Sequence, residues 1–116
     1  MAGAMELGTE ATAGPSTMTF GVCAACDPRV DEPSRQRVVN IIKRLAGVIA
    51  DRVRMPDGSP VNVAYAPLLI DTEKQADVVA RQFRAADVDA VVCCPDTWAF
   101  PQLTMMSLLS QLPDRT

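Results

Sequence analysis

The 116-residue sequence predicts a three-layer α/β fold built on a doubly wound parallel sheet, an incomplete Rossmann or flavodoxin-like half. Short apolar runs alternate with helix-like segments in the order β-α-β-α-β-α, and the turns between them are short. The composition is 48% hydrophobic but only 4% aromatic, which suits a core of Val, Ile, Leu and Ala. Right-handed crossovers would place the helices on the faces of such a sheet.

The three expected strands are short apolar segments. Residues 19–23 (TFGVC) follow a region without periodicity, and residues 61–65 (VNVAY) alternate as a strand does. Residues 89–94 (DAVVCC) include a continuous apolar run, which is typical of a strand covered on both faces.

The first helix is predicted over residues 34–54, where apolar residues recur at i, i+3 and i+4. Either Asp31 or Ser34 is suited to cap its start. The apolar stripe expected to face the core consists of Val38, Ile41, Ile42, Leu45, Val48, Ile49 and Val53.

Two further helices complete the pattern. Residues 73–86 form the second, with Thr72 and Gln75 spaced as a capping box. Residues 101–112 form the third, because Pro101 suits the first turn of a helix. This last segment lacks charges, so we expect a second cover beyond its own sheet, and either self-association or marginal stability where that cover is missing.

The domain is expected to span residues 19–116 and to stop where a fourth strand would begin. Residues 1–18 are rich in Ala, Gly, Thr, Ser and Pro without periodicity, and we expect them to be a disordered tail. On this interpretation the chain is a truncated part of a longer protein.

Charge and composition exclude several classes of function. The net charge is −3, so a nucleic-acid partner is not expected. No apolar run reaches the ~18 residues of a membrane span, and the start lacks the pattern of a secretory signal. We therefore expect a cytoplasmic protein with four reduced cysteines. There is no histidine, which removes the commonest general base and most mixed metal sites.

Ligands of a doubly wound sheet bind outside the carboxyl ends of its strands. Three loops are expected at that edge, over residues 24–33, 66–72 and 95–100. The polar and aromatic residues they carry are Asp27, Arg29, Asp71, Asp96 and Trp98, the only tryptophan. Without a ligand, Trp98 would be a partly buried loop aromatic and Arg29 a solvated surface charge.

The cysteines allow other chemistry. Cys23 and Cys26 form a CxxC, the spacing of a redox pair, and Cys23 with Arg29 forms C-x5-R, the spacing of a phosphate-binding nucleophile loop. A structural zinc site would add Cys93 and Cys94, although neighbouring residues on a strand point to opposite faces. Four small buried thiols are the simpler interpretation. No GxGxxG follows the first strand, so a nicotinamide cofactor has no support.

Three sequence segments, taken in their order along the chain, resemble the N-terminal domain of the L-fucose isomerase family. This family includes relatives acting on L-arabinose and D-arabinose. The three segments are Asp27-Pro28-Arg29 after the first strand, the PDGSPV turn at 56–61, and Trp98 soon after Pro95. The resemblance implies an aldose–ketose isomerase that uses a divalent metal, usually Mn²⁺, held by Glu, Asp and His of later domains. It also implies that Arg29 and Trp98 contact the sugar, in the active site of a neighbouring subunit.

The resulting expectation is a substrate-side domain of an isomerase of carbohydrate metabolism, inactive alone and with no catalytic or metal-binding residue of its own. Its partners would be a sugar, the remaining domains of the enzyme and further copies in a homo-oligomer. The alternatives are a non-catalytic carbohydrate-binding or assembly module, and a small thiol enzyme that uses Cys23.

Overall fold

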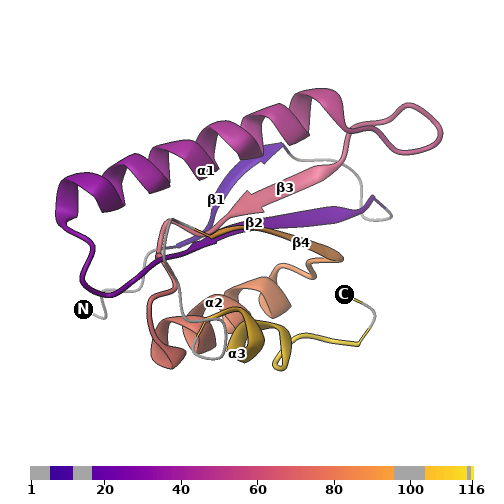
Figure 1. Cartoon of the computed structure of the whole chain (residues 1–116). Coiled ribbons are helices and arrows are strands. Elements are labelled where there is room, and N and C mark those ends of the chain that lie inside the picture. The colour runs from indigo at the N-terminus through magenta and orange to yellow at the C-terminus, as the bar shows by residue number, and fades with distance from the viewer. Residues whose placement is uncertain (1–5, 12–16, 96–103, 115) are drawn as a thin grey trace.

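The computed structural model describes residues 6–11, 17–95, 104–114 and 116. A four-stranded sheet with the order β1-β3-β2-β4 forms the middle layer. Helix α1 covers one face, and helices α2 and α3 cover the other (Figure 1). The predicted α/β architecture with a parallel core is confirmed.

Three parallel strands form that core: β2 (Thr19–Ala25), β3 (Asn62–Tyr65) and β4 (Ala90–Pro95). β2 lies in the centre, with Phe20 opposite both Val63 of β3 and Ala90 of β4. The chain leaves β2 through α1 to reach β3, then crosses through α2 to the other side of β2. The carboxyl ends of the three strands therefore meet at one edge, where the loops that follow them are expected to form a site.

Strand β1 (Gly8–Ala11) corrects the expectation that all of residues 1–18 are disordered. It pairs antiparallel with β3 at the edge of the sheet, with Gly8 opposite Tyr65. A Cβ at position 8 would overlap the Tyr65 ring, so glycine permits this close approach. The strand depends on pairing with a distant segment, and its own sequence has no alternation to indicate it.

Helix α1 (Glu32–Arg52) begins two residues earlier than predicted. Asp31 is its N-cap, and its carboxylate accepts a hydrogen bond of 3.0 Å from the Ser34 backbone N–H. Pro33 occupies the first turn, where its missing N–H costs no helical hydrogen bond.

The core-facing stripe of α1 is narrower than predicted. Ile41, Val48 and Val53 were expected to face the core, but all three are exposed, Ile41 to 49% and Val48 to 56%. The contact instead follows a line of residues spaced mostly by four, in which the small Ala46 allows close approach to the sheet. The buried residues of α1 are Val38, Ile42, Ala46 and Ile49.

Helix α2 (Glu73–Ala85) matches the prediction closely. Its buried face consists of Ala76, Val79, Ala80 and Phe83, as expected. The predicted capping box does not form, because the Thr72 hydroxyl contacts the side-chain oxygen of Gln75 and makes no hydrogen bond to the backbone.

Helix α3 (Met105–Leu109) is shorter than the predicted helix 101–112, of which residues 101–103 lie outside the described part of the chain. Leu108 and, beyond the helix, Leu112 are buried, whereas Met106 and Leu109 are exposed to 64% and 50%. The outer face of α3 is therefore apolar, as expected. The second cover for this face remains a prediction.

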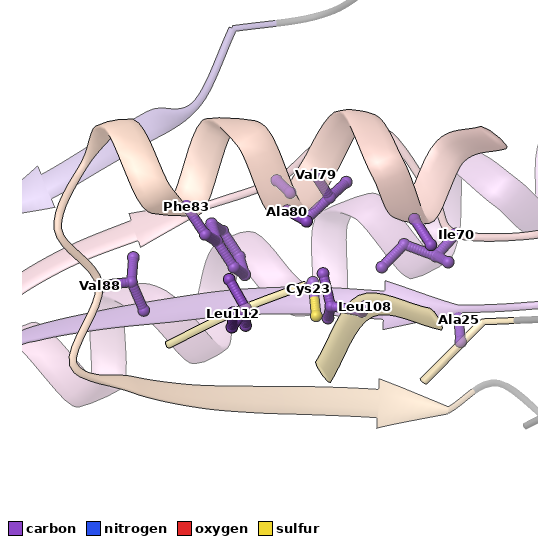
Figure 2. Packing of buried hydrophobic residues seen from close by; sticks show 11 residues of the cluster. Cys23, Ala25, Ile70, Val79, Ala80, Phe83, Val88, Leu108 and Leu112 are labelled. Carbon is purple, nitrogen blue, oxygen red and sulfur yellow. The ribbon is translucent and has the colours of Figure 1, made fainter. Parts of the chain in front are cut away.

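Two apolar clusters lie on the two sides of the sheet. The cluster beneath α1 contains Val22, Ala24, Ile42 and Val63. The cluster beneath α2 and α3 contains Phe83, its largest buried side chain, with Cys23, Val88 and Leu108 (Figure 2). Residues of β2 alternate between the two clusters, so the strand is buried on both faces as a parallel strand should be.

Candidate functional site at the carboxyl edge of the sheet

The loops after β2 and β3 lie side by side at the carboxyl edge. The Cys26 backbone N–H donates to the Ile70 carbonyl at 3.1 Å, and the Ile70 N–H donates to the Ala24 carbonyl at 2.9 Å. The chain after β3 thus continues to pair with the end of β2. Asp27 and Asp71 follow directly at this edge.

Asp27 holds Arg29 in a fixed position. Its Oδ1 accepts hydrogen bonds from the backbone N–H of Arg29 at 2.8 Å and from Nε at 2.9 Å, and its Oδ2 accepts from Nη2 at 2.7 Å. The Asp27 side chain is only 5% exposed, whereas that of Arg29 is 78% exposed. The buried carboxylate engages Nε and Nη2 of the largely exposed guanidinium, so Nη1 is left to donate to a ligand.

This arrangement also determines how Asp27 ionises. The hydrogen bonds from the side chain and backbone of Arg29 lower the pKa of Asp27 to about 2. Asp27 therefore stays ionised, and Arg29 stays paired, at any pH near neutrality.

Arg35 joins the two loops, a role that sequence reasoning missed. From the first turns of α1, its Nη2 donates to Asp71 Oδ2 at 2.6 Å, and its Nε donates to the Val30 carbonyl at 3.0 Å. A weaker hydrogen bond of 3.3 Å reaches the Pro28 carbonyl. Arg35 lies off the apolar stripe of the helix, and nothing in its spacing indicates that a carboxylate 36 positions away would meet it.

A pocket of about 160 Å³ opens beside this ion pair, between the start of α1 and the segment after β3. Its lining residues are Glu32, Arg35, Gln36, Val39, Pro67, Leu68 and Leu69. Arg29 does not line this pocket. The pocket and the edge of the sheet where a ligand is expected are therefore neighbours. Arg35 connects them, because it lines the pocket and also binds the loop that carries Arg29.

The structure places part of the predicted site. Asp27, Arg29 and Asp71 lie at the carboxyl edge, as expected. Asp96 and Trp98 lie outside the described residues, so the predicted proximity of Arg29 and Trp98 stays a prediction.

The alternative cysteine sites do not form. Cys23 packs in the cluster beneath α2 and Cys26 in the cluster beneath α1, so the sheet separates the two thiols of the CxxC. Cys93 and Cys94 divide between the same two faces, which rules out one four-cysteine zinc site. None of the four cysteines is in a disulfide.

The C-x5-R interpretation fails for a similar reason. Cys23 lies fully buried inside β2, whereas Arg29 binds Asp27 in the loop beyond it. A hydrogen bond with the Cys93 thiol and burial both raise the pKa of Cys23, so it does not offer a thiolate to a phosphorylated substrate in solution. The thiol-enzyme alternative based on Cys23 loses its proposed nucleophile.

An Asp27→Asn variant should reveal the contribution of the Asp27–Arg29 ion pair through the pH dependence of the stability. The folded-state pKa of about 2 lies below the usual value of about 4, so the stabilisation is fully present above about pH 4 and is lost as the pH falls through about 2. The urea midpoint of the variant should lie below that of the wild type at neutral pH, and the two should converge towards pH 2. Asp51→Asn, at an exposed carboxylate, is the matched control and should show no such convergence. A constant difference for Asp27→Asn across this range would contradict the assignment.

No helix in the described part of the chain is long and apolar enough to span a bilayer. Residues 17–115 match the family model described as L-fucose isomerase, first N-terminal domain. Neither the search of curated proteins nor the search of solved structures gave a match. The family match covers most of the chain, including all three parallel strands and the loops at their carboxyl ends.

Proposed function

Because the chain belongs to the L-fucose isomerase family, as its first N-terminal domain, we propose that it is the substrate-side domain of an aldose–ketose isomerase. Arg29 would hydrogen-bond the hydroxyls of the sugar, and Trp98 would cover its C–H face. The substrate class would be L-fucose or an arabinose. The remaining domains of the enzyme, in an oligomer, would supply the reacting groups.

The observation that most supports this role is the pairing of Asp27 with Arg29. A free arginine on a loop would lose side-chain entropy on binding a neutral sugar. Here a buried carboxylate already fixes one edge of the guanidinium, so the other edge can donate to hydroxyls with little further ordering. The same carboxylate offsets the charge of Arg29, which favours a neutral polyol over an anionic ligand.

The divalent metal of the proposed enzyme, Mn²⁺ or a related ion, does not fit this domain. Within the described residues, no group of three or more His, Cys, Asp or Glu side chains could hold a metal ion. The chain also has no histidine. We therefore propose that the metal is bound by other domains and that this domain positions the sugar.

Pure chain supplied with Mn²⁺ should not convert L-fucose or D-arabinose into the ketose. The reason is chemical, since no histidine is present and the described residues offer no set of metal ligands. Ketose formation measured by polarimetry or chromatography should equal that of a blank without protein. Turnover that depends on both metal and chain would contradict the assignment of catalysis to other domains.

In the isomerase assembled with its remaining domains, Arg29→Ala and Trp98→Ala should each reduce kcat/KM roughly 5- to 150-fold, the effect of losing one good contact. Metal affinity should not change, because neither residue is expected near the metal. Arg52→Ala, at an exposed arginine near the end of α1, is the matched control and should retain parental kinetics. If Arg29→Ala and Trp98→Ala also retain parental kinetics, both residues are structural.

The isolated chain offers a separate test of binding, because Trp98 is its only tryptophan. Titration with L-fucose should change the fluorescence, and Arg29→Ala should weaken the response while Arg52→Ala should not. The isolated chain could bind the sugar saturably while the same variants leave kcat/KM of the assembled enzyme unchanged. That combination would favour the alternative of a non-catalytic carbohydrate-binding module.

A further inference from the structure

Cys23 of β2 and Cys93 of β4 are direct partners in the register of the two central parallel strands. Both belong to the apolar cluster beneath α2 and α3, so their side chains lie on the same face of the sheet. Their thiols are hydrogen-bonded to each other. We infer that Cys23 and Cys93 form a redox-active dithiol, which a peroxide converts into a disulfide across the two strands.

The backbone already has suitable dimensions for this bond. Neighbouring strands of a sheet lie about 4.8 Å apart. Disulfides join residues whose Cα atoms are about 4.4–6.8 Å apart. Residues in register on β2 and β4 therefore need no separation or sliding of the strands, only rotation of two thiols that are already in contact.

The two thiols differ in a way that assigns their roles. Cys23 is fully buried in the cluster that also contains Leu108 (Figure 2), whereas Cys93 is partly exposed. The hydrogen bond from Cys23 lowers the pKa of Cys93, and the same contact together with burial raises that of Cys23. Cys93 is therefore the thiol that a peroxide would oxidise, and Cys23 the thiol that would resolve the product.

The chemistry balances in two steps. The Cys93 thiolate attacks one oxygen of hydrogen peroxide, the O–O bond breaks, and the products after proton transfer are a sulfenic acid on Cys93 and one water. The Cys23 sulfur then attacks the Cys93 sulfur, the S–O bond breaks, and the hydroxyl leaves with the Cys23 proton as a second water. The peroxide is reduced, and the two thiols are oxidised to one disulfide.

The chain carries its own control pair on the opposite face. Cys26 and Cys94 belong to the cluster beneath α1. The partner of Cys94 in β2 is Ala24, so Cys26 lies two positions further along the chain, just beyond the end of β2. These two cysteines share a face without being in register and should not form a disulfide in the folded protein.

The experiment treats the reduced chain with stoichiometric hydrogen peroxide, blocks the remaining thiols and digests with trypsin. One expected peptide, 1–29, contains Cys23 and Cys26, and another, 85–115, contains Cys93 and Cys94. Oxidation should link these two peptides within one monomer, with the loss of two hydrogens, and a thiol reductant should separate them.

Serine and alanine variants identify the pair. The linked peptides should persist in Cys26→Ala/Cys94→Ala and disappear in Cys23→Ser and in Cys93→Ser, with folding checked by circular dichroism. Linkage that survives in Cys23→Ala/Cys93→Ala would overturn the inference, as would linkage between molecules only. The unmodified chain provides a test independent of any variant, because absence of the linked peptides after oxidation would also overturn the inference.

Discussion

Replacement of Phe83 by alanine is expected to lower the free energy of unfolding by about 3–5 kcal/mol. The Phe83 ring is the largest fully buried side chain among the described residues, and it lies in the cluster between α2 and the sheet (Figure 2). Its edge lies so close to β2 that a Cβ at Gly21 would come within 3.0 Å of Cε2 and Cζ of the ring. Removing the ring would leave a cavity that the rigid central strand cannot move to fill.

Urea unfolding followed by circular dichroism measures this effect. A small domain is typically stable by about 5–15 kcal/mol, so Phe83→Ala should move the midpoint by a large fraction of its wild-type value. Val48→Ala is the matched control, because Val48 is an exposed apolar residue of α1 and its truncation should cost under about 0.5 kcal/mol. Similar midpoints for the two variants would mean that the α2 cluster is not the main core on that face.

Arg35→Ala is expected to cost about 2–4 kcal/mol, the second largest effect. The Arg35 side chain is 22% exposed and that of Asp71 is 13% exposed, so the ion pair is largely shielded from solvent. The variant would remove the hydrogen bonds to Asp71 and to two carbonyls of the loop after β2, and it would leave the Asp71 carboxylate without a counter-charge. Asp71 Oδ1 already has no hydrogen-bond partner among the described residues, so the carboxylate depends heavily on Arg35.

A double variant provides the decisive comparison. Arg35→Ala/Asp71→Asn should be more stable than Arg35→Ala, because the second substitution removes the unpaired charge. Hydrogen exchange in residues 26–31 should increase in Arg35→Ala, since the loop loses two of its anchors. Arg37→Ala, at an exposed arginine of the same helix, should change neither the midpoint nor the exchange by much. If the double variant is less stable than Arg35→Ala, the unpaired Asp71 charge is not the cause of the destabilisation, and the role given to the ion pair is wrong.

The elements with strong local patterns were predictable from the sequence. Helix α2 and the three parallel strands follow from the pattern of apolar residues, and the position of Asp27 and Arg29 at the carboxyl edge follows from their place directly after the first strand. The burial of Ile41 and Val48 was predicted wrongly, because an apolar residue beside the contact line of a helix looks the same in sequence as one on the line.

Features created by contacts between distant segments could not be predicted. Strand β1 forms only because the edge of β3 is available, and the ion pair of Arg35 with Asp71 requires the path of the chain to be known. The cysteines illustrate the same limit. Their spacing suggested a CxxC pair, but the register of β2 with β4 brings Cys23 to Cys93 instead.

The two edges of the sheet differ as templates for strand addition. β1 is short, and its register with β3 is irregular between Thr9 and Ala11, features that make an edge a poor template. β4 is a six-residue strand without charged residues, and among the described strands it pairs with β2 alone. If two molecules associated by pairing their β4 strands, the regular edge of each sheet would be used, and only the irregular β1 edges would remain unpaired. Such a dimer would offer no regular strand edge to a third molecule, so the sheet should favour finite assemblies over open fibres.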